Sequence, residues 1–221
     1  MTVGEGPGDT TPTPLQAGRA LLNLMQSQRA CRRFSAEPVP DEALAAMIRA
    51  ASHAPSAENR QPWIFVVVAD GELRAAIDDL GRSIWRGGGR DHSSATLAPR
   101  FFADVDEFFA SGHGGAPRLV VVAGDGRDGL VGDVLSSSVF PAVQNLLLAA
   151  AALGYGSTMT TLAAQQPAAL AALLGLPDDV VPLAVLPVGR PERPAGPPRR
   201  RPVEEIAHRD RFGDRFTVEP P

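Results

Sequence analysis

The stretch Ala54-Pro55-Ser56-Ala57-Glu58-Asn59-Arg60-Gln61-Pro62-Trp63 separates a periodic helical pattern from a dense apolar run. Its two prolines fix φ and break regular structure, and the polar residues between them offer short hydrogen-bonding side chains. A polar loop held between two core elements is either a plain connecting turn or a place where the scaffold presents binding groups. The local chemistry leaves both interpretations open, so segments elsewhere in the chain must decide between them.

The pattern on either side of this loop predicts a helix followed by a strand. Residues 41–51 begin with Asp41 and Glu42, and acidic residues in a first turn favour a helix. Apolar residues then recur at the spacing of one buried helical face: Leu44, Met47, Ile48 and Ala51. Residues 63–69 are β-branched and aromatic without interruption, which predicts a strand covered on both faces.

The rest of the chain alternates helical and extended patterns without a regular βαβ rhythm. Helices are expected at residues 15–28, 73–80, 133–153 and 167–174, and strands at 118–123, 155–161 and 180–188. Two prolines in the last strand favour an edge or bulged position. Residues 81–116 lose the pattern, which indicates a mobile insert carrying short helices. The predicted class is α+β, with a mixed sheet packed between helices.

Length and composition set limits on the function. The chain has 221 residues, of which 44% are hydrophobic, so one domain at residues 15–221 is expected after a flexible N-terminal arm at residues 1–14. The net charge of −4 speaks against nucleic acid and anionic membranes as partners. No apolar run approaches the roughly 20 residues of a membrane span, and the N-terminus lacks signal-peptide features. We therefore expect a cytoplasmic protein.

Three segments carry residue types suited to binding. Arg29, Arg32 and Arg33 form one basic cluster and residues 199–201 form another, and each is either a solvated face or a phosphate clamp. Residues 154–161 combine glycines with hydroxyls, which suits either a tight turn or hydrogen bonds to the polar edge of a heterocycle.

Several chemistries find no support in the sequence. Cys31 is the only cysteine, so an intrachain disulfide is excluded, and its thiol is either activated by nearby arginines or a small buried hydrophobe. The four histidines show no metal-ligand spacing, and neither a dinucleotide-binding nor a P-loop glycine pattern is present. No metal site is therefore expected.

Four segments, in the right order, resemble the FMN-dependent nitroreductase family. Arg29-Ala30-Cys31-Arg32-Arg33-Phe34 resembles the family's opening R-[RS]-S-x-R-x-F pattern, and residues 54–63 match its A-P-S-x-x-N-x-Q-P-W loop. Residues 144–150 are similar to its central helix, and residues 200–206 to its closing R-[RK]-P-L-E-E segment. The resemblance spans about residues 29–212.

The resemblance implies a set of FMN-binding residues. Arg29, Ala30 and Arg32 would hold the phosphate and ribityl chain, and Arg200, with Arg201 beside it, would close on the phosphate. The other implied contacts are to the isoalloxazine ring system: Pro55, Ser56, Asn59, Met159, Thr160 and Thr161, with Thr161 as a partner of flavin N5. Ala30 departs from the usual serine, and one lost hydrogen bond of about 1 kcal/mol would weaken FMN binding without abolishing it.

The resemblance also implies an intertwined homodimer with FMN at the interface and an NAD(P)H-driven ping-pong reaction. The flavin would carry the chemistry, so no protein side chain is expected to be catalytic. The substrate would be a nitroaromatic, a quinone or an enone, chosen by Trp85, Arg86 and Phe101 of the insert. The hydroxyl-rich residues 157–161 are closer to deiodinase-like members, which leaves one- and two-electron chemistry open. The alternatives are a flavin-dependent dehalogenase or dehydrogenase, and a flavin-binding module without turnover.

Overall fold

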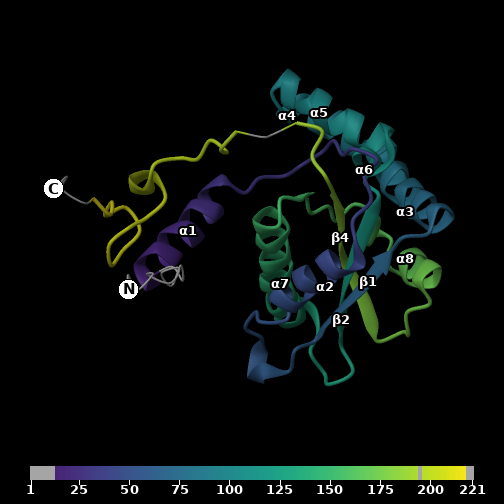
Figure 1. The fold of residues 1–221 in the computed structure, drawn as a ribbon, viewed down its shortest axis with the longest axis horizontal. Coiled ribbons are helices and arrows are strands. Elements are labelled where there is room, and N and C mark those ends of the chain that lie inside the picture. The colour runs from purple at the N-terminus through teal and green to yellow at the C-terminus, as the bar shows by residue number, and fades with distance from the viewer. Residues whose placement is uncertain (1–12, 194–195, 218–221) are drawn as a thin grey trace, which may run out of the picture.

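The computed structural model describes residues 13–193 and 196–217, and its centre is a four-stranded sheet (Figure 1). The strands are β1 (Trp63–Val68), β2 (Arg118–Asp125), β3 (Gly156–Ser157) and β4 (Val180–Gly189), in the spatial order β1-β2-β4-β3. The α+β class is therefore confirmed. All of these strand pairs are antiparallel, whereas the sequence had suggested a mixed sheet.

Helices cover both faces of this sheet. They are α1 (Pro14–Ser27), α2 (Asp41–Ala51), α3 (Gly71–Ile84), α4 (Arg90–Thr96), α5 (Pro99–Ala110), α7 (Gly132–Ala152) and α8 (Pro167–Leu174). Shorter turns are η1 (Ala57–Asn59), η2 (Trp85–Gly89), α6 (Gly112–Gly115), η3 (Ala163–Gln165) and η4 (Val203–Glu205). Each predicted helix is present.

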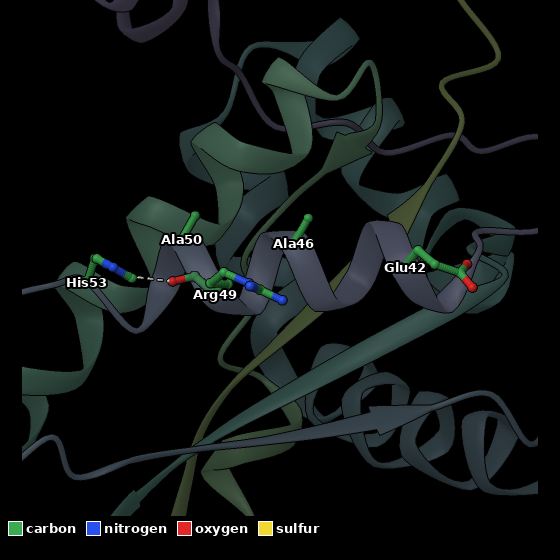
Figure 2. Close-up of a pocket in the computed structure, with 5 residues that line it drawn as sticks. All are labelled: Glu42, Ala46, Arg49, Ala50 and His53. Carbon is green, nitrogen blue, oxygen red and sulfur yellow. Dashed lines mark hydrogen bonds between the residues drawn. The ribbon is translucent and has the colours of Figure 1, made fainter.

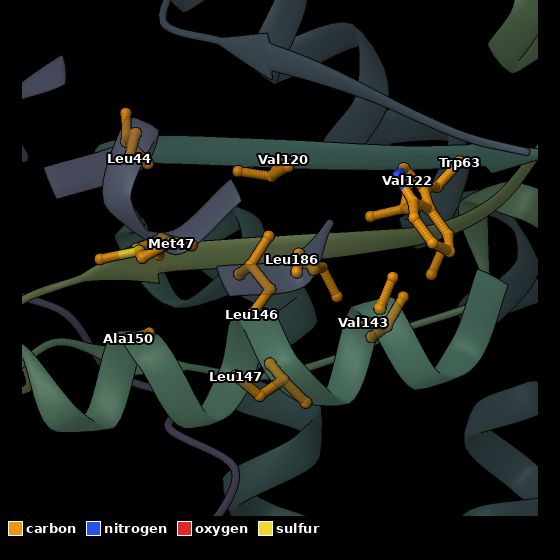
Figure 3. Packing of buried hydrophobic residues seen from close by; sticks show 14 of the residues in the cluster. Leu44, Met47, Trp63, Val120, Val122, Val143, Leu146, Leu147, Ala150 and Leu186 are labelled. Carbon is orange, nitrogen blue, oxygen red and sulfur yellow. The ribbon is translucent and has the colours of Figure 1, made fainter. Parts of the chain in front are cut away.

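The strand period of two sends alternate side chains of β2 into two separate cores. Val120 and Val122 face α2 and α7, where Figure 3 shows them against Met47 and Leu146. The intervening Leu119 and Val121 face the other way and pack against residues of α3, α5 and α8. β2 is buried on both faces, which explains its unbroken apolar sequence.

Of two expectations about strand position, one was wrong and one was confirmed. β1 lies at the sheet edge, and Val67 is 39% exposed, so this apolar run does not mark a strand covered on both faces. β4 is internal and not at an edge, but it has the bulge that its two prolines predicted, where the register with β2 shifts between Val122 and Ala123. Pro187 is tolerated there because its backbone faces the short β3 side, where its carbonyl accepts a hydrogen bond from Thr158 N at 3.4 Å.

The insert at residues 81–116 carries the expected short helices, and it is helical over most of its length. α3 continues to Ile84, and η2 leads directly into α4 and α5. Trp85 organises this region: its ring stacks on Phe109 at a centroid distance of 5.0 Å, and its Nε1 donates to Asp106 at 2.9 Å. The short helices were expected, but their bounds were not visible in the sequence, because Gly87-Gly88-Gly89 lowers helix propensity and the aromatic packing is a tertiary effect.

The expectation that no apolar run is long enough to span a bilayer was wrong. Helix α7 (Gly132–Ala152) is long and apolar enough to cross a membrane, by length and composition only. However, residues along this helix, among them Val139, Val143 and Leu146, are buried against the sheet and α2. The helix thus forms part of the protein core, as its apolar character on nearly all sides predicts.

The N-terminal helix and the C-terminal segment extend from this body (Figure 1). α1 begins with a Thr13–Gln16 capping box, yet none of its residues is buried. Its large apolar side chains are exposed in this chain: Leu15, Leu21, Leu22 and Met25. The C-terminal segment likewise exposes Val203, Ile206 and Phe212. The single chain therefore leaves two apolar arms uncovered.

Candidate functional site

The first basic segment lies across one end of the sheet. The Cys31 amide donates to the Ser157 carbonyl at 2.9 Å, and the Phe34 amide donates to the Gly114 carbonyl at 3.0 Å. These bonds fix the backbone on both sides of Arg32. The Arg32 guanidinium then lies 4.8 Å from the centre of the Phe101 ring, a cation–π contact with α5.

The charges around Arg32 suit an anionic ligand. Burial lowers the pKa of the Arg32 guanidinium, Asp104 opposes this shift, and Arg29 adds to it. Within the described residues, neither Arg29 nor Arg32 forms a salt bridge, whereas Arg33 lies 3.8 Å from Asp104. A half-buried cation beside a second cation is stabilised by a bound anion, and guanidinium groups bind phosphate through two parallel hydrogen bonds.

The second basic cluster lies on the C-terminal segment, which passes the first one. Arg29 Nη1 donates to the Gly196 carbonyl at 3.0 Å, so the start of this segment touches the Arg29 side chain. Arg200 and Arg201 are exposed, and Arg200 Nη1 donates only to the neighbouring Arg199 carbonyl at 3.0 Å. The C-terminal segment therefore contacts Arg29 through Gly196, but the structure does not bring Arg200 to Arg29.

Residues 156–161 begin beside the first basic segment, where Ser157 accepts the Cys31 amide, and they present unused backbone donors. Only β3 and an isolated bridge between Thr160 and Val185 remain of the strand expected at 155–161. In the described part of the chain, the amides of Met159 and Thr161 have no recorded acceptor, and both residues are exposed. Thr160 is buried, and its Oγ1 accepts from the Leu162 amide at 3.3 Å. These amides suit the polar edge of a heterocycle.

Cys31 is a packing residue, which decides between its two interpretations. Its Sγ donates to the Arg33 carbonyl at 3.3 Å, and it fills the space beside Gly156, where a Cβ would lie 2.6 Å from the sulfur. Burial raises the pKa of the Cys31 thiol despite the nearby Arg32, which favours the packing interpretation over an activated thiolate.

We expect Cys31 to react slowly with iodoacetamide near neutral pH. The raised pKa of its thiol means that the alkylation rate should still be rising at a pH where an ordinary thiol has levelled off. A pH series of alkylation rates, followed by mass spectrometry against free cysteine, measures this. A rate profile shifted to lower pH than that of free cysteine would contradict the packing role.

The loop at residues 55–61 is strained and held by many hydrogen bonds. Glu58, Asn59 and Gln61 have φ values of 51°, 56° and 52°, in the left-handed region that non-glycine residues rarely adopt. The Ser56 Oγ accepts from the Gln61 amide at 3.0 Å, and the Ser138 Oγ accepts from the Ala57 amide at 3.1 Å. Backbone strain fixed in this way occurs often at binding sites.

Supports for this loop come from residues that the sequence did not single out for it. Arg60 pairs with Glu58 and donates to the Asp128 carbonyl, which ties the loop to the segment after β2. Ser138 belongs to α7, 81 positions away from Ala57. Meanwhile Pro55 and Asn59, the expected ligand contacts, remain exposed. No sequence signal could have found Ser138, because its role depends on the docking of α7.

The loop and the basic segment lie at opposite ends of the sheet. The Asp125 amide donates to the Pro62 carbonyl at 2.7 Å, which places the loop at the C-terminal end of β2. The basic segment contacts Ser157, which pairs with Val188 near Arg118 at the other end. At about 3.4 Å per residue, the ends of β2 are roughly 24 Å apart. One chain therefore does not bring these two groups together.

The three residues expected to select the substrate lie in different surroundings. Trp85 is 5% exposed and packs in the core formed with α3, α5 and α8. Arg86 is exposed, and the Phe101 ring lies against the Arg32 guanidinium. A cavity of about 550 Å³ adjoins Trp85 and reaches Leu162, the residue after Thr161. Its other lining residues are Ser83, Ile84, Gly87, Gly88, Gly89, His92, Ser93 and Gln165. Its size falls within the range of small-molecule sites.

A second depression, of about 430 Å³, runs along the outer face of α2 (Figure 2). All five lining residues come from this helix or the turn after it: Glu42, Ala46, Arg49, Ala50 and His53. His53 Nδ1 is hydrogen-bonded to the Arg49 carbonyl at 2.8 Å, as in an ordinary helix end. The small Ala46 and Ala50 leave a flat face that another element could approach closely.

Comparison with known proteins identifies the class of protein. The Nitroreductase family model matches residues 25–190, so the chain belongs to the Nitroreductase family and the predicted resemblance is confirmed.

Individual relatives agree with this assignment. A protein of Archaeoglobus fulgidus, provisionally named an NADH dehydrogenase/NAD(P)H nitroreductase, is 28% identical over 173 residues, which is 77% of this chain and 85% of the relative. A provisionally named nitroreductase of Desulfovibrio desulfuricans, solved in complex with FMN, is 27% identical with a TM-score of 0.68; the match covers 91% of this chain and 99% of that one. Iodotyrosine deiodinase bound to FMN and 3-iodo-L-tyrosine is also 27% identical, with a TM-score of 0.69, and covers 87% and 100%.

Proposed function

We propose that this chain is an FMN-dependent NAD(P)H oxidoreductase whose basic segment binds the flavin phosphate. The observation that carries the proposal is the half-buried Arg32, which lies beside Arg29 without a salt bridge in the described residues. The segment that carries Arg32 is bonded through the Cys31 amide to Ser157, two residues before the open amide of Met159. Membership of the Nitroreductase family and the FMN found in two similar solved structures support it.

Each group of residues has a distinct task in this proposal. Arg29 and Arg32 neutralise and orient the phosphate, and Phe101 shields Arg32 from water. The backbone donors at Met159 and Thr161 orient the ring system, while Ala30 supplies backbone without a hydroxyl. FMN held by these residues would supply the redox chemistry between NADH or NADPH and a second substrate. The chain's own part is to position the flavin, exclude water and supply electrostatic complementarity.

The complete site requires a homodimer. The loop with Pro55, Ser56 and Asn59 and the basic segment of the same chain lie at opposite ends of β2, a strand roughly 24 Å long, so we place the loop against the flavin of the partner subunit. The uncovered apolar residues of α1 and of the C-terminal segment support an intertwined dimer, because exposed apolar patches of this kind mark interfaces. The flat face of α2 is a further surface that the partner could cover.

The substrate is a small planar molecule such as a nitroaromatic, a quinone or an enone. The cavity beside Trp85, Leu162 and Gln165 supports this, because it borders the residue that follows Thr161. A second candidate is a flavin-dependent dehalogenase or dehydrogenase, favoured by the similarity to iodotyrosine deiodinase. A third is a flavin-binding module without turnover. The domain would be residues 15–221, acting in the cytoplasm without nucleic acid or membrane as partners.

The first test is the visible absorption spectrum of the purified protein. Flavin absorption, with FMN released into the supernatant on heating, is expected. A colourless protein that also fails to take up added FMN would overturn the proposal. Stopped-flow mixing with NADH or NADPH then separates the candidates, because bleaching of the flavin indicates an oxidoreductase and its absence indicates a binding module. Turnover with a halogenated phenol would favour the dehalogenase.

We expect Arg200→Ala to weaken FMN binding about threefold to tenfold, because an exposed arginine contributes less than a half-buried one. The measurement is the dissociation constant of FMN, from quenching of its fluorescence on titration with apoprotein. Arg199→Ala is the matched control, since its side chain lies next to Arg200 and has no expected contact with the phosphate. Full FMN affinity in Arg200→Ala would remove the C-terminal segment from the site.

A further inference from the structure

A buried aspartate–histidine pair lies at the turn of residues 112–115, which contacts the basic segment through Gly114. This pair has no part in the function proposed above. His113 is 1% exposed and hydrogen-bonded through Nδ1 to Asp78 of α3, whose side chain is 16% exposed. The His113 ring lies edge-on to Phe108 and Phe109, at centroid distances of 5.4 and 6.1 Å. Its Nε2 has no hydrogen-bond partner in the described residues. Burying a polar ring in this way is costly, so its retention calls for an explanation.

The backbone around His113 strengthens that point. Gly112, His113, Gly114 and Gly115 all have positive φ, at 67°, 46°, 71° and 72°. Three of these four positions carry glycine, the residue that adopts this conformation without strain. A non-glycine residue there is strained, because its Cβ lies too close to the backbone. His113 therefore occupies a position that glycine would suit better, and its side chain must compensate through the bond to Asp78 and the aromatic contacts.

The turn that His113 anchors supports the basic segment from behind. The Gly114 carbonyl accepts the Phe34 amide at 3.0 Å. Gly114 also lies so close to the Arg32 carbonyl that a Cβ at this position would collide with it. On its other side, the segment is held by the bond from the Cys31 amide to Ser157. The backbone of Arg32 is thus held between β3 and this left-handed turn.

We infer that Asp78 and His113 are positioning residues for the flavin phosphate: the buried pair fixes the turn at residues 112–115, and Gly114 thereby sets the position of Arg32. This inference rests on the proposed function, because it assigns the pair to the same FMN site. The pair lies behind the segment and touches no ligand. A misplacement of about 1 Å at a charged binding group can cost up to two orders of magnitude, so the effect on phosphate binding is measurable.

The test compares the affinities of FMN and riboflavin, which differ only in the phosphate. His113→Gly removes the ring while glycine accepts the positive φ, and Asp78→Ala removes the acceptor. Both should lower the ratio of FMN affinity to riboflavin affinity at least tenfold. His113→Asn should restore the ratio to within threefold of the wild-type value, because its Nδ2 can take the place of Nδ1 and asparagine tolerates positive φ.

The matched control is Asp79→Ala, since Asp79 is the next residue on α3, is exposed and pairs only with Arg82. It should leave the ratio unchanged. Each variant is titrated below its thermal unfolding midpoint, so that loss of folding is not read as loss of affinity. An unchanged ratio in His113→Gly overturns the inference, as does a failure of His113→Asn to restore it. If the wild-type protein binds neither FMN nor riboflavin, the proposed function itself fails. The wild-type titration alone shows this, so that outcome is distinct from a failure of the inference about Asp78 and His113.

Discussion

Replacing Arg32 by alanine is expected to weaken FMN binding at least about 30-fold. Truncating one partner of a desolvated charge pair costs roughly 2–5 kcal/mol, and each 1.4 kcal/mol is a factor of ten. Arg32 is half-buried, rests on Phe101, and forms no salt bridge in the described residues that could substitute for the phosphate. The loss should appear in the FMN dissociation constant, measured by quenching of flavin fluorescence.

Arg33→Ala is the matched control for this variant. Arg33 follows Arg32 directly and carries the same charge, but its side chain is 50% exposed and lies near Asp104. Its removal should change FMN affinity less than threefold, since surface ion pairs contribute about 0–1 kcal/mol. Equal losses in the two variants would mean that the segment acts only through its net charge. An unchanged affinity in Arg32→Ala would remove this residue from the phosphate site.

The second large effect concerns the dimer. Pro55→Trp places a bulky side chain on an exposed loop position, where it should block the flavin of the partner subunit and abolish FMN uptake in the homodimer. The Arg32→Ala homodimer should bind FMN weakly because both of its sites lack the Arg32 guanidinium. A mixed dimer of the two variants, however, contains one site with an intact Arg32 and an intact Pro55. We therefore expect recovery of tight FMN binding at one site per mixed dimer.

This recovery depends on the geometry of the sheet. The two groups lie at opposite ends of β2, a strand roughly 24 Å long, so the proposed site combines Arg32 of one chain with Pro55 of the other. The measurement is the FMN stoichiometry of mixed dimers isolated through two different affinity tags. A second mixed dimer pairs a wild-type chain with a chain that carries both Arg32→Ala and Pro55→Trp. Neither of its sites is complete, so it should bind no FMN tightly. Absence of any recovery would mean that each chain builds its own site.

Much of the fold could be predicted from the sequence because local patterns determine it. The apolar spacing of residues 41–51 and the unbroken run at 118–123 each specify one element, whatever the rest of the chain does. The order of four motifs also identified the Nitroreductase family, which the match over residues 25–190 confirms. The basic segment and the loop at residues 55–61 were likewise visible, because arginines and paired prolines are distinctive in sequence.

Other features were decided only by the tertiary structure. The position of β1 at the sheet edge and of β4 inside it follows from strand order, which no local pattern encodes. The helical insert depends on Trp85 packing against Phe109 and bonding to Asp106, contacts between residues more than 20 positions apart. The raised pKa of the Cys31 thiol arises from burial, which outweighs the neighbouring arginines that the sequence shows.

The features that the sequence determined and those that only the tertiary structure decided differ for one physical reason. Residue types and their spacing fix local conformation and the chemistry available, so the sequence alone determined the elements, the family and the basic segment. Burial, strand order and the separation of sites depend on which distant segments meet, and that is a property of the whole packed chain. Asp78 and His113 illustrate this: 35 positions apart and inconspicuous in sequence, they form a buried pair behind Arg32 only because α3 and the turn at residues 112–115 pack together.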